Sequence, residues 1–185
     1  MTKSLIIFFI SISATLINNS TNADQKDPRL SMLFTRLLTV SPGPRSIALE
    51  NDIWKIWLET EDQAIQKLMK TGDYATQENQ LQDALKTYTQ VLQKDPNFAE
   101  AWNKRALTYY LMGNYTASLS DIRKTLTLEP RHFGALSGQG LIYSAQNKWT
   151  LAKRVFRKAL EIHPTMRGPR INLSIIEKQE DEEEA

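Results

Sequence analysis

Histidine and cysteine are the side chains that most often carry acid–base, nucleophilic and metal chemistry at neutral pH, and this sequence has few of them. It contains two histidines, His132 and His163, and no cysteine. The absence of cysteine excludes disulfides, thiolate metal sites and a cysteine nucleophile. Two histidines are too few for a histidine-based metal site without many carboxylate partners, and they give serine little from which to build a nucleophile–base pair. His132 stands alone at the start of a predicted helix, which favours a capping or surface role over proton transfer or ligand binding.

No sequence motif for catalysis or cofactor binding is present. The chain has no glycine-rich phosphate loop, no H-E-x-x-H and no G-x-S-x-G. We therefore expect no enzymatic activity, no cofactor and no metal. The formal net charge of +2 is also too small to indicate nucleic-acid binding on its own. The sequence favours a protein that acts by binding.

Three prolines mark the period of the segment that must position any binding surface. Pro96, Pro130 and Pro164 lie 34 residues apart, twice in succession. Two copies of one pattern lie between them. The first copy is Trp102, Ala106, Tyr109, Gly113, Tyr115, Ser118, Ile122 and Pro130, and the second is Leu136, Gly140, Tyr143, Asn147, Trp149, Ala152, Phe156 and Pro164. A period of this length is typical of two-helix repeats stacked into a solenoid.

This pattern resembles the tetratricopeptide repeat (TPR) family, whose template is W-x-x-L-G-x-x-Y, then A-x-x-x-F, then P. The resemblance implies an all-α fold, a right-handed TPR-like solenoid of about three helix-turn-helix repeats with N- and C-terminal capping helices. Small residues such as Ala106 and Gly140 are needed where the two helices of a repeat cross closely. Large residues such as Trp102 then fill the core around the crossing. Gly113 is expected to end one helix in the left-handed conformation, and Asn114 to cap the next helix.

The expected organisation follows the 34-residue period in both directions. The segments are 1–23, a signal peptide; 24–64, N-terminal capping helices; 65–98, a degenerate first repeat; 99–132, the second repeat; 133–166, the third repeat; and 167–185, a C-terminal capping helix and acidic tail. The first repeat is degenerate because Leu68 replaces the template tryptophan and Ala75 the template tyrosine. The acidic run at 180–184 is most simply a solvated, frayed tail.

Residues 1–23 have the features of a secretory signal peptide. Lys3 supplies a short basic region, residues 5–17 are largely apolar, and Thr21-Asn22-Ala23 loosely fits a cleavage site. We expect export, to the periplasm if the source is bacterial. The alternative is an uncleaved N-terminal anchor, although the apolar run is shorter than the roughly 20 residues that a bilayer-spanning helix needs.

Apolar residues recur at helical spacing from 28 to 40 and from 46 to 60, on either side of the turn residues Ser41-Pro42-Gly43-Pro44. The second of these predicted helices carries Trp54 and Trp57. The interpretation that we favour is that both tryptophans pack against the first repeat as part of an N-terminal cap. The alternative is an aromatic pair that binds a ligand.

The TPR resemblance implies a concave groove, lined by the first helix of each repeat, that holds a peptide or a helix of a partner protein. The groove residues that we expect are Asn103, Lys104, Leu107, Tyr110, Gly134, Ser137, Gly138 and Leu141. Gly134 and Gly138 lie one turn apart, so that a partner backbone could approach them closely. One TPR subset clamps a C-terminal carboxylate, but at the matching positions only Asn103 and Lys104 suit that task. A chaperone-tail clamp is therefore not expected.

Charged side chains in the repeats suggest two further features. Arg105 occupies a position where the template is apolar, and we expect Asp121 on the opposing helix to pair with it; a ligand-facing Arg105 is the alternative. The second feature is a basic ridge on the convex face: Arg123, Lys124, Lys153, Arg154, Arg157 and Lys158. This ridge supports an alternative function as a binder of polyanions or anionic surfaces, which the acidic tail could fold back to regulate. The simpler interpretation is that both charged features keep the protein soluble.

Overall fold

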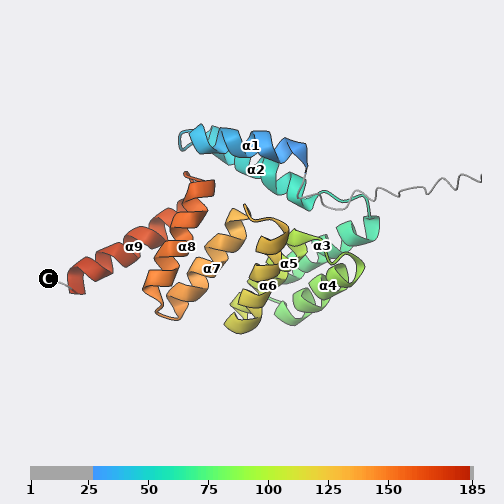
Figure 1. Cartoon of the computed structure of the whole chain (residues 1–185). Helices are drawn as coiled ribbons and strands as arrows, with labels where there is room; N and C mark the ends of the chain where they lie inside the picture. The colour runs from blue at the N-terminus through green and yellow to red at the C-terminus, as the bar shows by residue number, and fades with distance from the viewer. Residues whose placement is uncertain (1–26, 184–185) are drawn as a thin grey trace, which may run out of the picture.

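The computed structural model describes residues 27–183, apart from the side chains of 181 and 183, and over this range it contains nine α-helices and no strand. The predicted signal peptide, residues 1–23, lies outside the described residues. The helices are α1 (Pro28–Thr39), α2 (Pro44–Leu58), α3 (Gln63–Gln77), α4 (Leu81–Lys94), α5 (Ala99–Leu111), α6 (Tyr115–Leu128), α7 (Phe133–Ala145), α8 (Trp149–Ile162) and α9 (Arg167–Glu183). The predicted all-α solenoid is confirmed: α3–α4, α5–α6 and α7–α8 are successive helical pairs (Figure 1).

Each pair turns back on itself through a residue in the left-handed conformation. These residues are Asn79, Gly113 and Asn147, with φ values of 56°, 74° and 57°. They are spaced by the same 34 residues as the prolines, and asparagine and glycine are the residues that most readily adopt positive φ. Asn114 caps α6 by accepting a hydrogen bond from the backbone N–H of Ala117 at 3.1 Å, as expected.

Small residues lie where the paired helices cross. A Cβ atom at Gly72 would lie 2.6 Å from the ring of Tyr88, and one at Gly140 would lie 2.3 Å from the ring of Phe156. Neither contact is sterically allowed, so the close crossing requires glycine at both positions. The first repeat keeps this geometry although its sequence is degenerate. Trp102 differs from expectation, since it is only half-buried at the edge of the core and its indole N–H donates to the Pro96 carbonyl at 2.8 Å.

The C-terminal helix α9 occupies the position that the first helix of a further repeat would take. It packs on α7 and α8, and Ser174 continues the 34-residue series of small residues formed by Ala106 and Gly140. Helix α9 extends into the acidic run as far as Glu183. Terminal repeats of solenoids need a polar outer face, and charged residues supply one on α9.

The N-terminal hairpin, defined here as α1 and α2, does not cap the first repeat. It lies across the ends of α5, α7 and α8, at the top of the view in Figure 1. Its apolar core, which includes Leu30, Leu37 and Ile53, closes on Phe133 and Ile162 of the third repeat. The four residues between α2 and α3 allow this return. None of the helices between residues 27 and 183 is both long and apolar enough to cross a lipid bilayer.

Candidate functional site

The first helices of the repeats, α3, α5, α7 and α9, lie side by side and line the inner face of the solenoid. Residues 34 apart share a position on this face. One row across it is Leu107, Leu141 and Ile175, and the next is Asn103, Ser137 and Ile171. Leu107 is 46% exposed and Ile175 is 50% exposed, so the inner face presents large apolar side chains to solvent. We call these two rows the inner-face rows.

The predicted groove residues do not form one open surface. Leu107 is exposed, and Tyr110 is half-buried against the ring of Tyr115. Ser137 is half-buried, and Leu141 packs with Ile176 of α9. The remaining four predicted residues, Asn103, Lys104, Gly134 and Gly138, contact other parts of the chain.

Gly134 is covered by the N-terminal hairpin. A Cβ atom at this glycine would lie 2.6 Å from the indole ring of Trp54, and at Gly138 it would lie 3.8 Å from Ile122 of α6. The structure therefore contradicts the expectation that Gly134 is open to a partner backbone, whereas Gly138 makes only an ordinary van der Waals contact. The glycine at 134 admits an indole of the same chain, and Gly138 faces the preceding helical pair.

The two tryptophans of α2 pack against the third repeat and not against the first, which corrects the predicted cap. Trp57 is buried and stacks on the imidazole of His132, with ring centroids 4.2 Å apart and an interplanar angle of 10°. Trp54 meets His132 edge-on at 5.3 Å and Phe133 at 5.4 Å. His132 and Phe133, at the start of α7, therefore form the surface on which the two tryptophans pack.

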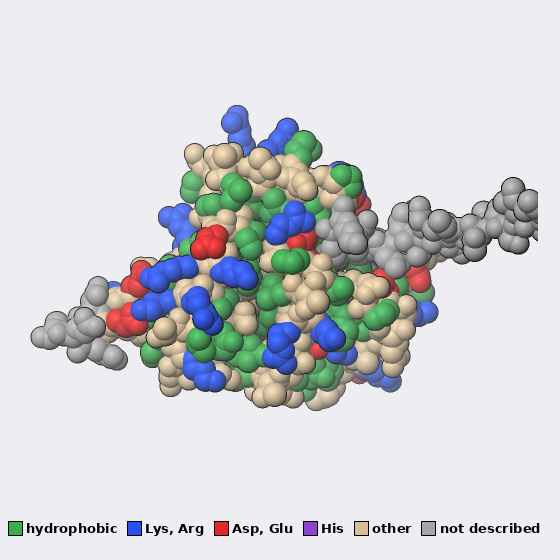
Figure 2. Space-filling model, viewed as in Figure 1, with side chains coloured by type: hydrophobic (Ala, Val, Ile, Leu, Met, Phe, Trp, Pro, Cys, Tyr) green, Lys and Arg blue, Asp and Glu red, His purple; other side chains and the backbone are tan. Residues whose placement is uncertain are grey.

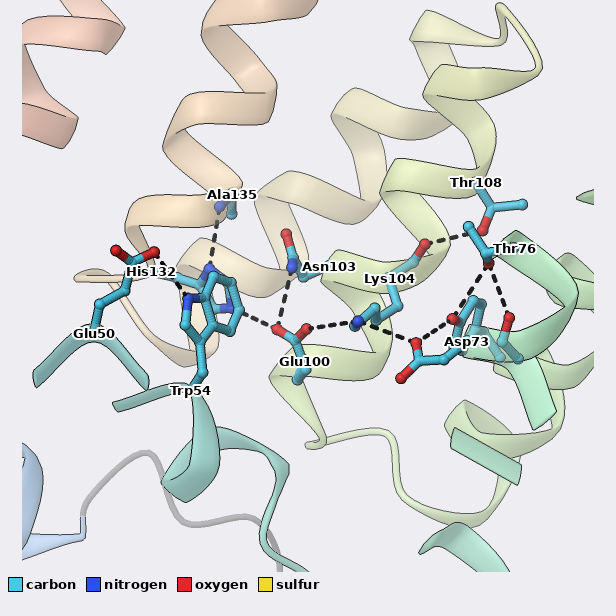
Figure 3. Close-up of polar contacts among 12 residues, drawn as sticks. Glu50, Trp54, Asp73, Thr76, Glu100, Asn103, Lys104, Thr108, His132 and Ala135 are labelled. Carbon is cyan, nitrogen blue, oxygen red and sulfur yellow. Dashed lines mark hydrogen bonds and ion pairs between the residues drawn. The ribbon is translucent and has the colours of Figure 1, made fainter. Parts of the chain in front are cut away.

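His132 is the N-cap of α7, as expected, but it is buried and not on the surface. Its Nδ1 accepts a hydrogen bond from the backbone N–H of Ala135 at 3.1 Å, so the ring proton is on Nε2. That nitrogen lies 2.9 Å from Oε2 of the buried Glu100 and donates to it (Figure 3). The imidazole thus links the start of α7 to the first turn of α5, and the indole rings of Trp54 and Trp57 pack against it.

Glu100 extends this contact into a polar network on the inner face (Figure 3). Asn103 donates to its carboxylate at 3.1 Å. The Lys104 ammonium lies 3.9 Å from Glu100 and 3.0 Å from Asp73. Asn103 and Lys104 are therefore already engaged by acidic groups of this chain.

A second histidine–carboxylate contact fixes the other side of the hairpin. His163, the buried C-cap of α8, lies 3.2 Å from Oε2 of Glu50 on α2, and the Trp54 indole N–H donates to the same carboxylate at 3.4 Å. The hydrogen bond from His163 lowers the pKa of Glu50 below its ordinary value, although burial acts in the opposite direction. The folded state therefore favours the ionised carboxylate.

Glu50→Gln should therefore lower the free energy of unfolding at neutral pH. A carboxyl group with a lowered pKa in the folded state stabilises that state fully above its ordinary pKa, and the contribution is lost as the pH falls through the lowered value. The difference between the variant and the wild-type protein should thus shrink below about pH 4. Urea unfolding from pH 3 to 7, with the exposed Glu61→Gln as control, measures this. An equal difference at every pH would contradict the assignment.

The predicted pair of Arg105 and Asp121 is present. The guanidinium donates two hydrogen bonds to the carboxylate, at 2.7 and 3.0 Å, and a third to Thr89 at 3.1 Å. Burial opposes the charge on Arg105, but the hydrogen bonds to Asp121 and the negative charge of that carboxylate together raise the pKa of Arg105. The guanidinium also lies over the Trp102 ring, 4.8 Å from its centroid. Arg105 therefore has a structural position and does not face a ligand.

The basic ridge lies over α6 and α8, where Figure 2 shows Lys and Arg side chains gathered. Acidic residues of α9 contact two of its members: Glu180 pairs with Lys153, and Glu177 lies 2.8 Å from Arg157. The other four members are exposed and form no ion pair with a described acidic side chain: Arg123, Lys124, Arg154 and Lys158. The α9 acids reach the ridge from a helix and not from a flexible tail.

Two contributors to the inner face are not among the residues predicted from the sequence. One is the hairpin that covers Gly134. A glycine directly after two aromatic residues, His132 and Phe133, could have indicated that a large side chain packs at this position. The other is α9, whose Ile171 and Ile175 extend the inner-face rows and could have been found by adding 34 to Ser137 and Leu141. Among the side chains that the structure describes, no three His, Asp or Glu come together as metal ligands would.

Comparison with protein families gives three matches. Residues 72–113 match a family described as TPR repeat, and residues 99–132 and 135–165 each match a tetratricopeptide repeat family. A TPR repeat-containing protein of Rhizobium etli is 35% identical over 139 residues, covering 75% of this chain and 68% of the relative. Several further curated relatives are longer, and this chain spans 11–30% of them.

Solved structures show the same fold at low sequence identity. The TPR domain of Arabidopsis OM64 has a TM-score of 0.61 at 18% identity, covering 63% of this chain and 96% of the domain. The first TPR of Spaghetti (RPAP3), solved with the HSP90 peptide SRMEEVD, has a TM-score of 0.60 at 22% identity, covering 64% of this chain and 94% of that one. These likenesses support the assignment of the helical pairs.

Proposed function

Because this chain belongs to the tetratricopeptide repeat family, we propose that it is a scaffold that holds a peptide or a helix of a partner protein against its inner face. It is not proposed to be an enzyme. A solved relative in fold, the first TPR of Spaghetti, is bound to a peptide of HSP90, which supports a peptide as the kind of ligand.

The observation that carries the proposal is the exposure of large apolar side chains along the inner-face rows. Leu107 on α5 and Ile175 on α9 occupy equivalent positions two repeats apart, and each is about half exposed. Leu141, the residue of the same row on α7 between them, is half-buried. Large apolar side chains that are exposed at equivalent positions on one face of a solenoid are typical of a surface that binds protein. The hairpin narrows this surface at Gly134 and leaves both of these residues free.

Leu107→Glu should remove partner binding without unfolding the protein, since the side chain is exposed and lies on a helix. The control is Met32→Glu, which places the same charge at a 52% exposed position on α1. Affinity capture from cell-envelope extract, quantified by mass spectrometry, should yield proteins bound by the wild-type protein and by Met32→Glu but lost with Leu107→Glu. Capture profiles that are identical for all three would overturn the proposal.

We extend the proposal to export, on the basis of Lys3 and the apolar run that follows it. The protein would then act in the periplasm of a bacterial source, and an uncleaved N-terminal anchor is the alternative. These residues lie outside the described part of the chain.

A second candidate function is the binding of an anionic surface by the basic ridge. It is favoured by one observation, that Arg123, Lys124, Arg154 and Lys158 are exposed without an acidic partner in the described residues. Neighbouring acids of α9 neutralise Lys153 and Arg157, which weakens the ridge at its C-terminal side. Such binding would fall steeply with salt, whereas binding at the apolar inner face would not.

A further inference from the structure

An open cleft with a volume of about 620 Å³ separates the first turns of α2 from α9. Ser46 and Ile47 line it on the α2 side, and Arg167, Arg170, Ile171 and Ile175 line it on the α9 side. A cleft of this size is within the range of about 300–1,000 Å³ that is usual for ligand sites in proteins. The two isoleucines of α9 belong to the inner-face rows, so the cleft continues the surface that is proposed to bind a partner.

The cleft is positively charged. Arg167 and Arg170 are exposed, and none of the acidic side chains that the structure describes pairs with either of them. Glu50 is the acidic residue of the lining, and its carboxylate is already engaged by His163 and Trp54. The N-terminal ends of α2 and α9 also lie at the cleft, and helix N-termini carry partial positive charge. An anionic group that enters the cleft therefore meets two arginines with no competing ion pair.

Apolar side chains lie beside these charges. Ile47 is 57% exposed and Ile171 is 45% exposed, and together with Ile175 they present aliphatic surface from both walls. Arginine pairs with carboxylates through two parallel hydrogen bonds, and isoleucine favours aliphatic partners. The chemistry of the lining thus selects a ligand that carries carboxylates and aliphatic side chains close together.

The charge at this cleft differs from that elsewhere on the inner face. Lys104, on α5, is held by Asp73 and Glu100, so a ligand carboxylate would have to displace an internal partner to reach it. The arginines of α9 need no such displacement. Charge complementarity therefore places the anionic part of a partner at α9.

We propose that the cleft between α2 and α9 binds an extended peptide segment that carries both acidic and aliphatic side chains. The proposal deepens the proposed function and rests on it, because the cleft is one end of the same inner face. The acidic groups pair with Arg167 and Arg170, and the aliphatic groups contact Ile47, Ile171 and Ile175.

Selection of a displayed random-peptide library against the purified protein tests this without a known partner. The enriched peptides should combine acidic and aliphatic residues. One of them, and its analogue with glutamine in place of each glutamate, is then measured by fluorescence anisotropy. The acidic peptide should bind roughly tenfold or more tightly than the analogue, because charge-assisted hydrogen bonds to arginine are lost.

Two matched double variants locate the site. Arg167→Gln with Arg170→Gln should weaken binding of the acidic peptide by roughly tenfold or more. Arg154→Gln with Lys158→Gln removes the same charge from the basic ridge and should change binding by less than about twofold. All four side chains are exposed, so both variants should keep the far-UV circular dichroism spectrum of the wild-type protein.

Equal weakening by the two double variants would overturn the proposal, because net charge alone would then account for binding. Enriched peptides without acidic residues would also overturn it. If a peptide binds less tightly to Leu107→Glu but not to the double variant of Arg167 and Arg170, it does not bind in the cleft. That result would contradict the inference about the cleft and would still support the proposed function. Failure to enrich any peptide would count against both.

Discussion

Trp57→Ala should lower the free energy of unfolding by about 3–5 kcal/mol, the cost of removing a buried aromatic side chain from a packed core. The Trp57 ring is buried, stacks on His132 and packs against Phe34 and Phe133. Its removal would leave a cavity where the N-terminal hairpin meets the third repeat. Urea unfolding followed by far-UV circular dichroism measures the loss.

Trp57→Phe is the informative companion variant. The indole N–H of Trp57 is buried without a hydrogen-bond partner, and an unsatisfied buried donor is itself unfavourable. Phenylalanine removes that donor and keeps most of the ring contact, so it should cost far less than alanine. If Trp57→Ala unfolds at the same urea concentration as the wild-type protein, the hairpin does not pack on the third repeat in solution.

Arg105→Leu should cost about 3 kcal/mol of unfolding free energy, because it leaves the carboxylate of Asp121 buried without its cation. The same change also removes the hydrogen bond to Thr89 and the contact with the Trp102 ring. Thermal and urea unfolding of the variant, compared with the wild-type protein, measure the effect.

The double variant Arg105→Leu with Asp121→Leu separates the charge from the packing. Apolar residues of similar volume often replace a buried ion pair at little cost, so the double variant should recover most of the lost stability. A double variant that is no more stable than Arg105→Leu would show that the loss comes from packing around Trp102. The coupling energy follows from the cycle completed by Asp121→Leu alone.

The repeat architecture could be predicted because each local requirement recurs every 34 residues. Pro130 and Pro164, the small residues Ala106 and Gly140, and the turn residues Gly113 and Asn147 meet the same steric need twice. The ion pair of Arg105 and Asp121 was predictable for a related reason, since a charge near a helix crossing needs a partner on the facing helix.

The position of the N-terminal hairpin could not be predicted in the same way. The helical periodicity of residues 28–58 shows that an apolar face exists, but it does not say which surface covers that face. The position of the hairpin depends on complementary shape. The indole of Trp54 fits only where Gly134 has no side chain, and the indole of Trp57 stacks on the ring of His132. The predicted groove was wrong at Gly134 for this reason. The site residues of α9 were missed because the period was not continued past Pro164.

The contact between Glu50 and His163 joins residues 113 positions apart in the chain. During synthesis, the hairpin leaves the ribosome well before the third repeat that covers its apolar face. The helical pairs between them can form from local contacts alone, and local contacts form quickly. The hairpin therefore cannot dock until almost the whole chain has been synthesised, and until then Trp57 and its apolar neighbours remain exposed to solvent. Its docking joins α1 to α8, the contacting helices that are farthest apart in sequence among the described residues. It is therefore expected to be the last step of folding and the step most open to chaperone capture or aggregation.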